Sequence, residues 1–105
     1  MKNYHVIGVM SGSSLDGLDI AFCYFKKKEN KWGFKILKAH TIPYSKKWKE
    51  NLSTAYRRNA YDFIKLHKEY GKFIGLKINN FLNDCNESRH IKLVSSHGHT
   101  IFHKP

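Results

Sequence analysis

Residues 8–19 read Gly-Val-Met-Ser-Gly-Ser-Ser-Leu-Asp-Gly-Leu-Asp, a small and polar centre with an apolar run on each side. The run from Val6 to Met10 is short and nearly continuous, which is typical of a strand covered on both faces. Small residues at positions 11–14 predict a tight turn, and the sequence becomes apolar again from Leu18 to Phe25. We therefore predict two neighbouring strands joined by a tight polar turn.

A third strand follows in the same pattern. The polar stretch from Lys26 to Lys31 predicts a second turn, after which Trp32, Phe34 and Ile36 alternate with the period of a strand. Pro43 should end this strand, because proline cannot donate a hydrogen bond to a sheet. Three strands joined by two short turns form an antiparallel meander.

The pattern then changes to that of helices. Ser45 is suited to cap a short helix, and Asn59 to cap a longer one that starts near Ala60. Apolar residues recur every three or four positions in the longer helix: Phe63, Leu66, Tyr70, Ile74, Ile78, Phe81 and Cys85. Gly71 and Gly75 lie four residues apart inside it, which predicts that the helix backbone lies close to another element. The run from Ile91 to Val94 predicts a fourth strand.

This order of elements predicts an α/β fold of the ribonuclease H-like (actin-like ATPase) type, which actin, Hsp70 and the sugar kinases share. That architecture begins with a three-stranded antiparallel meander, continues with helices and a fourth strand, and then adds further elements. We expect residues 1–105 to be the N-terminal part of a sugar-kinase-like ATPase domain, with no second domain in this chain. We expect the domain to be incomplete, lacking an edge strand and at least one covering helix.

Composition limits the classes of protein to which this chain can belong. The chain has 105 residues, of which 41% are hydrophobic, so a folded domain is expected rather than a disordered one. Its formal net charge of +11 leaves a basic polyanion-binding protein as one alternative, but no nucleic-acid recognition motif accompanies the lysines, so we expect no specific nucleic-acid partner. The apolar run near the start is too short for a signal peptide or a membrane span. We therefore expect a cytoplasmic protein that does not associate with a membrane. Cys23 and Cys85 have no metal or redox spacing and are interpreted as small core residues.

The predicted turn has the chemistry of an anion site. A turn between antiparallel strands can direct several backbone N–H groups at one point, and Gly12 and Gly17 would let the backbone approach a phosphate. Hydroxyl donors come from three serines: Ser11, Ser13 and Ser14. Asp16 and Asp19 could hold a hydrated Mg²⁺, which prefers oxygen ligands. From the residues alone, an ordinary serine- and glycine-rich hairpin without a ligand is an equally good interpretation.

Residues 8–19 resemble, almost residue for residue, the opening motif of the anhydro-N-acetylmuramic acid kinases. Threonine is usual in that family where this chain has Ser13, and both residues carry a hydroxyl. The resemblance implies that the turn is a phosphate loop for ATP and Mg²⁺, with Ser11 as an additional phosphate contact. The implied ATP-binding residues are Gly12, Ser13, Ser14, Leu15, Asp16, Gly17, Leu18 and Asp19.

A histidine cluster lies in residues 96–103. If this segment forms an extended strand, His97, His99 and His103 share one face, and such a cluster would suit a zinc ion. The alternative is the end of a strand whose histidines form hydrogen bonds with neighbouring residues. The family carries His-Gly-Gln-Thr here, beside the amino-sugar site. The resemblance therefore implies a sugar site at four residues, with histidine replacing the family's glutamine: His97, Gly98, His99 and Thr100.

The resemblance implies a kinase that transfers the γ-phosphate of ATP to 1,6-anhydro-N-acetylmuramic acid while water opens the anhydro ring. The product, N-acetylmuramic acid 6-phosphate, serves the recycling of peptidoglycan sugars. The family's general base is an aspartate in a second phosphate motif beyond Pro105, so we expect no catalytic residue, and little or no activity, in this chain alone. A complementary C-terminal chain or a homodimer would be its partners, besides ATP and the anhydro amino sugar. A non-catalytic nucleotide- or phosphate-binding module remains an alternative.

Overall fold

The described residues form one mixed sheet, two α-helices and a short 3-10 helix. A computed structural model describes residues 2–12, 14–83, 91–99 and 101. In chain order the elements are β1 (Lys2–Ser11), β2 (Gly17–Lys28), β3 (Lys31–Pro43), α1 (Lys46–Ser53), the 3-10 helix η1 (Ala55–Arg57), α2 (Ala60–Leu82) and β4 (Ile91–His99). The strand order is β3-β2-β1-β4, with β4 parallel to β1 and the other pairs antiparallel. The predicted α/β fold, with a meander, then helices, then a fourth strand, is confirmed.

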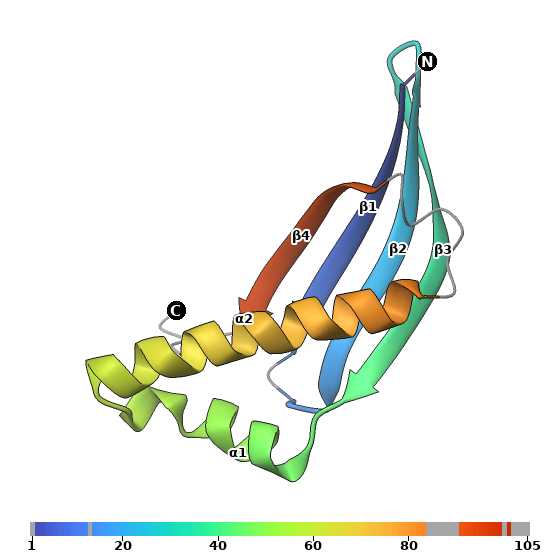
Figure 1. Ribbon diagram of the computed structural model, residues 1–105. Coiled ribbons are helices and arrows are strands. Elements are labelled where there is room, and N and C mark those ends of the chain that lie inside the picture. The colour runs from blue at the N-terminus through green and yellow to red at the C-terminus, as the bar shows by residue number, and fades with distance from the viewer. Residues whose placement is uncertain (1, 13, 84–90, 100, 102–105) are drawn as a thin grey trace.

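Helix α2 crosses one face of the sheet, as Figure 1 shows. Because side chains alternate along a strand, every second residue of β1 and β2 points to this inner face: Ile7, Val9, Leu18, Ile20 and Phe22. These five are at most 5% exposed, and they share one core with Tyr70 and Phe81 of α2. Full burial of such a side chain contributes about 1.5–3 kcal/mol, so this contact fixes the helix on the sheet.

The outer face carries no helix among the described residues. Alternate residues of the first three strands point to it: Gly8, Met10, Asp19, Ala21, Ala39 and Thr41. Large apolar strand side chains remain exposed, including Met10 at 52% and Ile36 at 55%. Exposed apolar side chains on one face of a sheet are typical of a surface that another element or chain covers. The domain is therefore incomplete, as the sequence predicts.

Both helices begin where the sequence predicts. Ser45 caps α1, since its Oγ accepts a hydrogen bond from the N–H of Trp48 at 3.2 Å. Asn59 caps α2 in the same way, accepting from the N–H of Asp62 at 2.8 Å. Each side chain satisfies a backbone donor that has no partner within the first turn of the helix.

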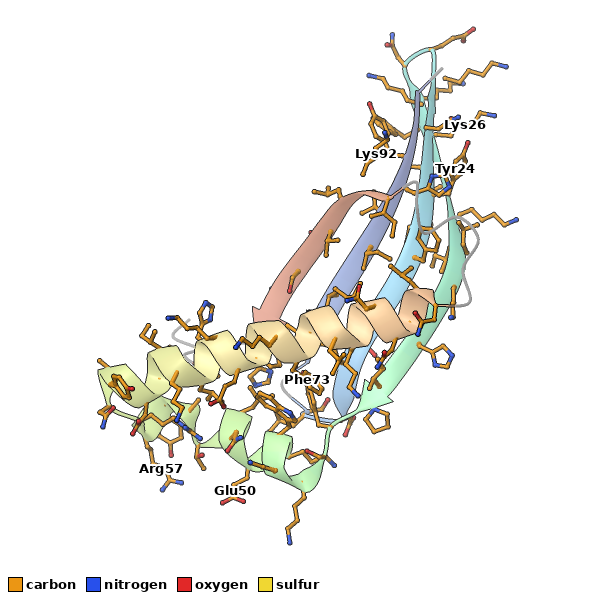
Figure 2. All side chains as sticks on the ribbon, viewed as in Figure 1. Tyr24, Lys26, Glu50, Arg57, Phe73 and Lys92 are labelled. Atoms are coloured by element: carbon orange, nitrogen blue, oxygen red, sulfur yellow. The ribbon has the colours of Figure 1, made fainter. Side chains whose placement is uncertain are left out.

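The two ends of α2 are fixed by different contacts. Near its C-terminus, Lys38 of β3 donates to the carbonyl oxygen of Phe81 at 2.7 Å and lies over the Phe81 ring, a favourable place for a cation at a helix end. Nearer its middle, Phe73 packs against Trp48 of α1, with ring centroids 4.9 Å apart. Figure 2 shows Phe73 below α2, on the side of α1 and the strand ends.

Two expectations are corrected. A Cβ added at Gly71 or Gly75 would have no heavy atom of another element within 4 Å, so the predicted close approach of the helix backbone is wrong. Cys23 is a free, half-buried cysteine in β2 and lies outside the buried core cluster, whereas Cys85 falls outside the described residues.

None of the described helices combines the length and the apolar character that a membrane crossing requires.

The start of β2 lies unusually close to the end of β3. A Cβ on Gly17 would clash with the carbonyl oxygen of Ile42, far inside normal contact. Only glycine fits here, because a backbone carbonyl cannot move aside as a flexible side chain can.

We predict that Gly17→Ala lowers the free energy of unfolding by about 1–3 kcal/mol, the usual effect of overpacking. Urea denaturation followed by circular dichroism measures this change. Gly33→Ala in β3 is the matched control, because an added Cβ there meets no heavy atom within 4 Å. Equal stability of the two variants would contradict the close approach of β2 to β3.

Candidate functional site

The loop of residues 12–16 joins β1 to β2 and is the centre of the candidate site. The N–H of Leu15 donates to the carbonyl oxygen of Gly12 at 3.1 Å, which closes the loop into a compact turn. Leu15 has a φ of 60°, uncommon for a residue with a side chain, and that side chain packs against the core. The predicted bend between two strands is confirmed.

The residues of the loop differ in what they present to a ligand. Ser14 and Asp16 are exposed, and Gly12 is half-buried. A Cβ added at Gly12 would have only the Ser14 Oγ nearby, at 3.7 Å, so the fold itself does not require glycine there. The Leu18 side chain is fully buried, and β3 occupies the space beside Gly17. Ser13 lies outside the described residues.

The hydroxyl of Ser11 turns inward rather than toward the loop. Ser11 is 4% exposed, and its Oγ accepts a hydrogen bond from the Tyr44 hydroxyl at 2.7 Å. The Nδ1 of His99 lies 2.8 Å from the same Oγ, and the hydroxyl of Tyr70 lies 2.7 Å from that of Tyr44. These bonds form a network that is buried apart from the half-buried His99. This buried network joins α2, the residue after β3, β1 and β4 through Tyr70, Tyr44, Ser11 and His99.

Burial sets the protonation of this network. It raises the pKa of Tyr44 far above its usual value, although the hydrogen bond with Ser11 opposes this shift. Tyr44 therefore stays neutral and keeps its donor. Burial also lowers the pKa of His99, against a hydrogen bond with the Ser11 backbone, so the neutral imidazole is favoured.

Sequence reasoning missed Tyr44 as a member of this network. It follows Pro43 directly and lies outside the apolar stripe of either helix, so no local pattern distinguishes it. Tyr70 belongs to the predicted stripe of α2, which indicates burial but not a hydrogen bond. A buried tyrosine hydroxyl needs a partner, and that general rule was the one available signal.

Strand β4 extends to His99 and contains a bulge. Val9 pairs with Ser96 and Ser11 with His99, so β4 has one residue more than β1 across this interval. Gly98, with a φ of 74°, provides the left-handed conformation that the bulge needs. The extra residue reverses the alternation, so His97 lines a hollow of the outer face while His99 faces α2.

The expectation that His97 and His99 share one face is therefore wrong. Among the described residues no group of three or more His, Cys, Asp or Glu side chains could hold a metal ion. Thr100 and His103 lie outside the described part of the chain. The zinc interpretation consequently has no support from the described histidines.

Two hollows border β4, and no described residue of the 12–16 loop lines either of them. The one on the outer face has a volume of about 710 Å³, and Met10, Asp19, Thr41 and His97 help to line it. The carboxylate of Asp19 accepts a hydrogen bond from the Thr41 hydroxyl at 2.5 Å. Asp16 and Asp19 are both exposed to solvent.

The second hollow, of about 550 Å³, lies between α2 and the end of β4. Leu66, His67 and Tyr70 line it from the helix, and Gly98 and His99 line it from the strand. Its wall is mainly apolar with a few polar groups, which is typical of pockets for small molecules. Two of the four residues of the implied sugar site thus border one cavity.

The comparisons with known proteins all indicate the same family. The family model for anhydro-N-acetylmuramic acid kinase matches residues 4–105. A protein named anhydro-N-acetylmuramic acid kinase from Pseudoalteromonas translucida is 36% identical over 104 residues, which are 95% of this chain and 26% of that protein. One of the same name from Bacillus cereus is 29% identical, over 96% of this chain and 27% of its own length. The chain spans about a quarter of the length of these curated relatives.

We predict that stability falls when the pH is lowered through the range of His99. Its pKa is lower in the folded than in the unfolded protein, so the unfolded protein binds more protons between the two values. The contribution of neutral His99 to the free energy of unfolding is complete above about pH 6.5. It is lost as the pH falls toward the pKa of His99 in the folded protein. Urea denaturation at several pH values measures this slope.

His99→Gln should make that slope shallower, because glutamine keeps a donor and an acceptor but does not titrate. His97→Gln is the matched control, since His97 is exposed on the outer face. An identical slope in wild type and His99→Gln would contradict this assignment.

Proposed function

Because the chain belongs to the anhydro-N-acetylmuramic acid kinase family, we propose that the 12–16 loop and the start of β2 bind the phosphates of Mg·ATP. The observation that carries this proposal is a compact turn between two strands that leaves unfilled space beside Gly12. The proposed contacts include backbone groups of buried residues as well as exposed side chains: Gly12, Ser13, Ser14, Leu15, Asp16, Gly17, Leu18 and Asp19.

The roles within this segment differ. Ser14 offers an exposed hydroxyl to a phosphate oxygen, and Gly12 leaves room for that oxygen to approach the backbone. Asp16 and Asp19 would hold Mg²⁺ through its water ligands, and the ion would neutralise phosphate charge. The Ser11 side chain is bonded within the buried network. Ser11 would therefore support phosphate binding by fixing the loop.

We further propose that the complete enzyme phosphorylates 1,6-anhydro-N-acetylmuramic acid with hydrolytic opening of its ring. The cavity at the end of β4 is the candidate for the sugar, because Gly98 and His99 line it next to β1, which carries the loop. Phosphoryl transfer depends chiefly on positioning and charge neutralisation, and a phosphate loop beside a sugar pocket meets both needs. The cytoplasm, where ATP is available, is the compartment that this activity requires.

A basic hairpin supports a second candidate function, the binding of polyanions. The turn between β2 and β3 has a hollow whose lining is mainly basic but includes one acidic residue: Lys26, Lys28, Glu29, Lys31, Trp32 and Gly33. Lys27 lies over the exposed ring of Trp32. Figure 2 shows Lys26 at the end of the sheet away from the helices. Lysines beside an exposed aromatic ring suit a polyanion, whose binding would weaken steeply with salt.

We predict that Gly12→Ala weakens the binding of Mg·ATP at least about tenfold, or about 1.4 kcal/mol, because the new methyl group fills the space left for a phosphate. Isothermal titration calorimetry at two salt concentrations measures the dissociation constant. Gly33→Ala in the basic hairpin is the matched control and should bind as the wild type does.

The outcomes separate the candidates. Binding that withstands added salt and is lost in Gly12→Ala supports the nucleotide site, whereas binding that falls steeply with salt in all three proteins supports a polyanion site. A wild-type chain that binds no Mg·ATP refutes the nucleotide proposal.

We predict that the 105-residue chain alone does not turn over ATP in the presence of the anhydro sugar. It spans about a quarter of the length of its relatives, and ring opening needs a general base as well as a phosphate loop. A coupled assay for ADP, with a buffer control, measures the rate. Sustained ADP release that depends on the sugar would contradict this prediction.

A further inference from the structure

Tyr44 contacts both ends of the 12–16 loop. Its backbone N–H donates to the carbonyl oxygen of Asp16 at 3.3 Å, on the side where β2 begins. Its hydroxyl donates to the Oγ of Ser11 at 2.7 Å, on the side where β1 ends. Tyr44, the residue after β3, therefore bridges the two sides of the loop, and its own side chain is buried.

The Tyr44 side chain is itself held rigidly. It is 5% exposed, and its ring packs near those of Tyr70 and Phe73, with centroids 6.5 and 6.0 Å away. The hydroxyl of Tyr70 also bonds to that of Tyr44, so a helix supports the group that meets Ser11. No buried side-chain polar atom in the described part of the chain lacks a partner. Such a fully satisfied network permits few alternative geometries.

We propose that Tyr44 is a positioning residue, which holds the 12–16 loop in its ligand-binding shape by bonding to both of its ends. This inference rests on the proposed binding of Mg·ATP by the loop. A loop that is already ordered loses less conformational entropy on binding, so its affinity is higher than that of a mobile loop. Through Ser11 the same bond reaches His99, so the geometry of the loop depends on that of the end of β4.

The decisive variant is Tyr44→Phe, which keeps the backbone bond to Asp16 and the aromatic packing but removes the hydroxyl. We expect the dissociation constant for Mg·ATP to rise about tenfold, the factor that corresponds to one neutral hydrogen bond. Measurements at a temperature where circular dichroism shows each variant to be fully folded exclude an effect of stability. Tyr61→Phe, which removes a hydroxyl from a side chain that is 79% exposed, is the matched control.

A second measurement reports on the loop itself. Hydrogen exchange of the loop amides should quicken in Tyr44→Phe relative to the amides of β2, because one end of the loop is released. A merely structural role would lower the melting temperature but leave both the affinity of the folded protein and this ratio unchanged. If Tyr44→Phe does not fold, Ser11→Ala decides by the same two criteria, since it removes the acceptor and leaves Tyr44 bonded to Tyr70.

The outcomes distinguish this proposal from the one on which it rests. A wild-type chain that fails to bind Mg·ATP removes the proposed function. If the wild type binds, Gly12→Ala does not, and Tyr44→Phe binds as tightly as the wild type, the loop is the nucleotide site and Tyr44 does not position it. Weakened binding with faster loop exchange in Tyr44→Phe, and neither change in Tyr61→Phe, supports the positioning role.

Discussion

The structure depends on the burial of one side of β2 beneath α2. Leu18, Ile20 and Phe22 are at most 1% exposed, and β2 is the central partner of both β1 and β3. Removing such side chains from water is the largest favourable contribution to folding, so it determines which face of the sheet the helix covers. Once that face is fixed, Ser11 must also point inward, because it follows Ile7 and Val9 at a spacing of two.

An inward serine at the edge of an apolar core would be unfavourable without partners. Tyr44 and His99 provide them, and Tyr70 in turn bonds to Tyr44. The requirement that buried polar groups be satisfied thus links four elements that hydrophobic packing alone would only bring near one another. The loop takes its shape from this requirement, because both of its ends are bonded to Tyr44.

The sequence predicted the features that local signals specify. The end of β3 at Pro43 and the starts of the helices after Ser45 and Asn59 depend on residues only a few positions apart. The buried network could not be predicted, because its bonded pairs lie 26, 33 and 88 residues apart. The bulge at Gly98 escaped prediction as well, since a single extra residue reverses a strand's alternation while leaving its composition unchanged.

The same reasoning explains why the loop and the histidine segment lie at one edge of the sheet. β1 and β4 are neighbours and run parallel, so their carboxyl ends, at Ser11 and His99, lie at the same edge of the sheet. Ligands of α/β proteins commonly bind at that edge, where loops replace regular pairing. The bulge then turns His99 toward Ser11 while His97 stays on the outer face. Parallel pairing therefore brings together two motifs from opposite ends of the sequence, and one hydrogen bond joins the strands that carry them.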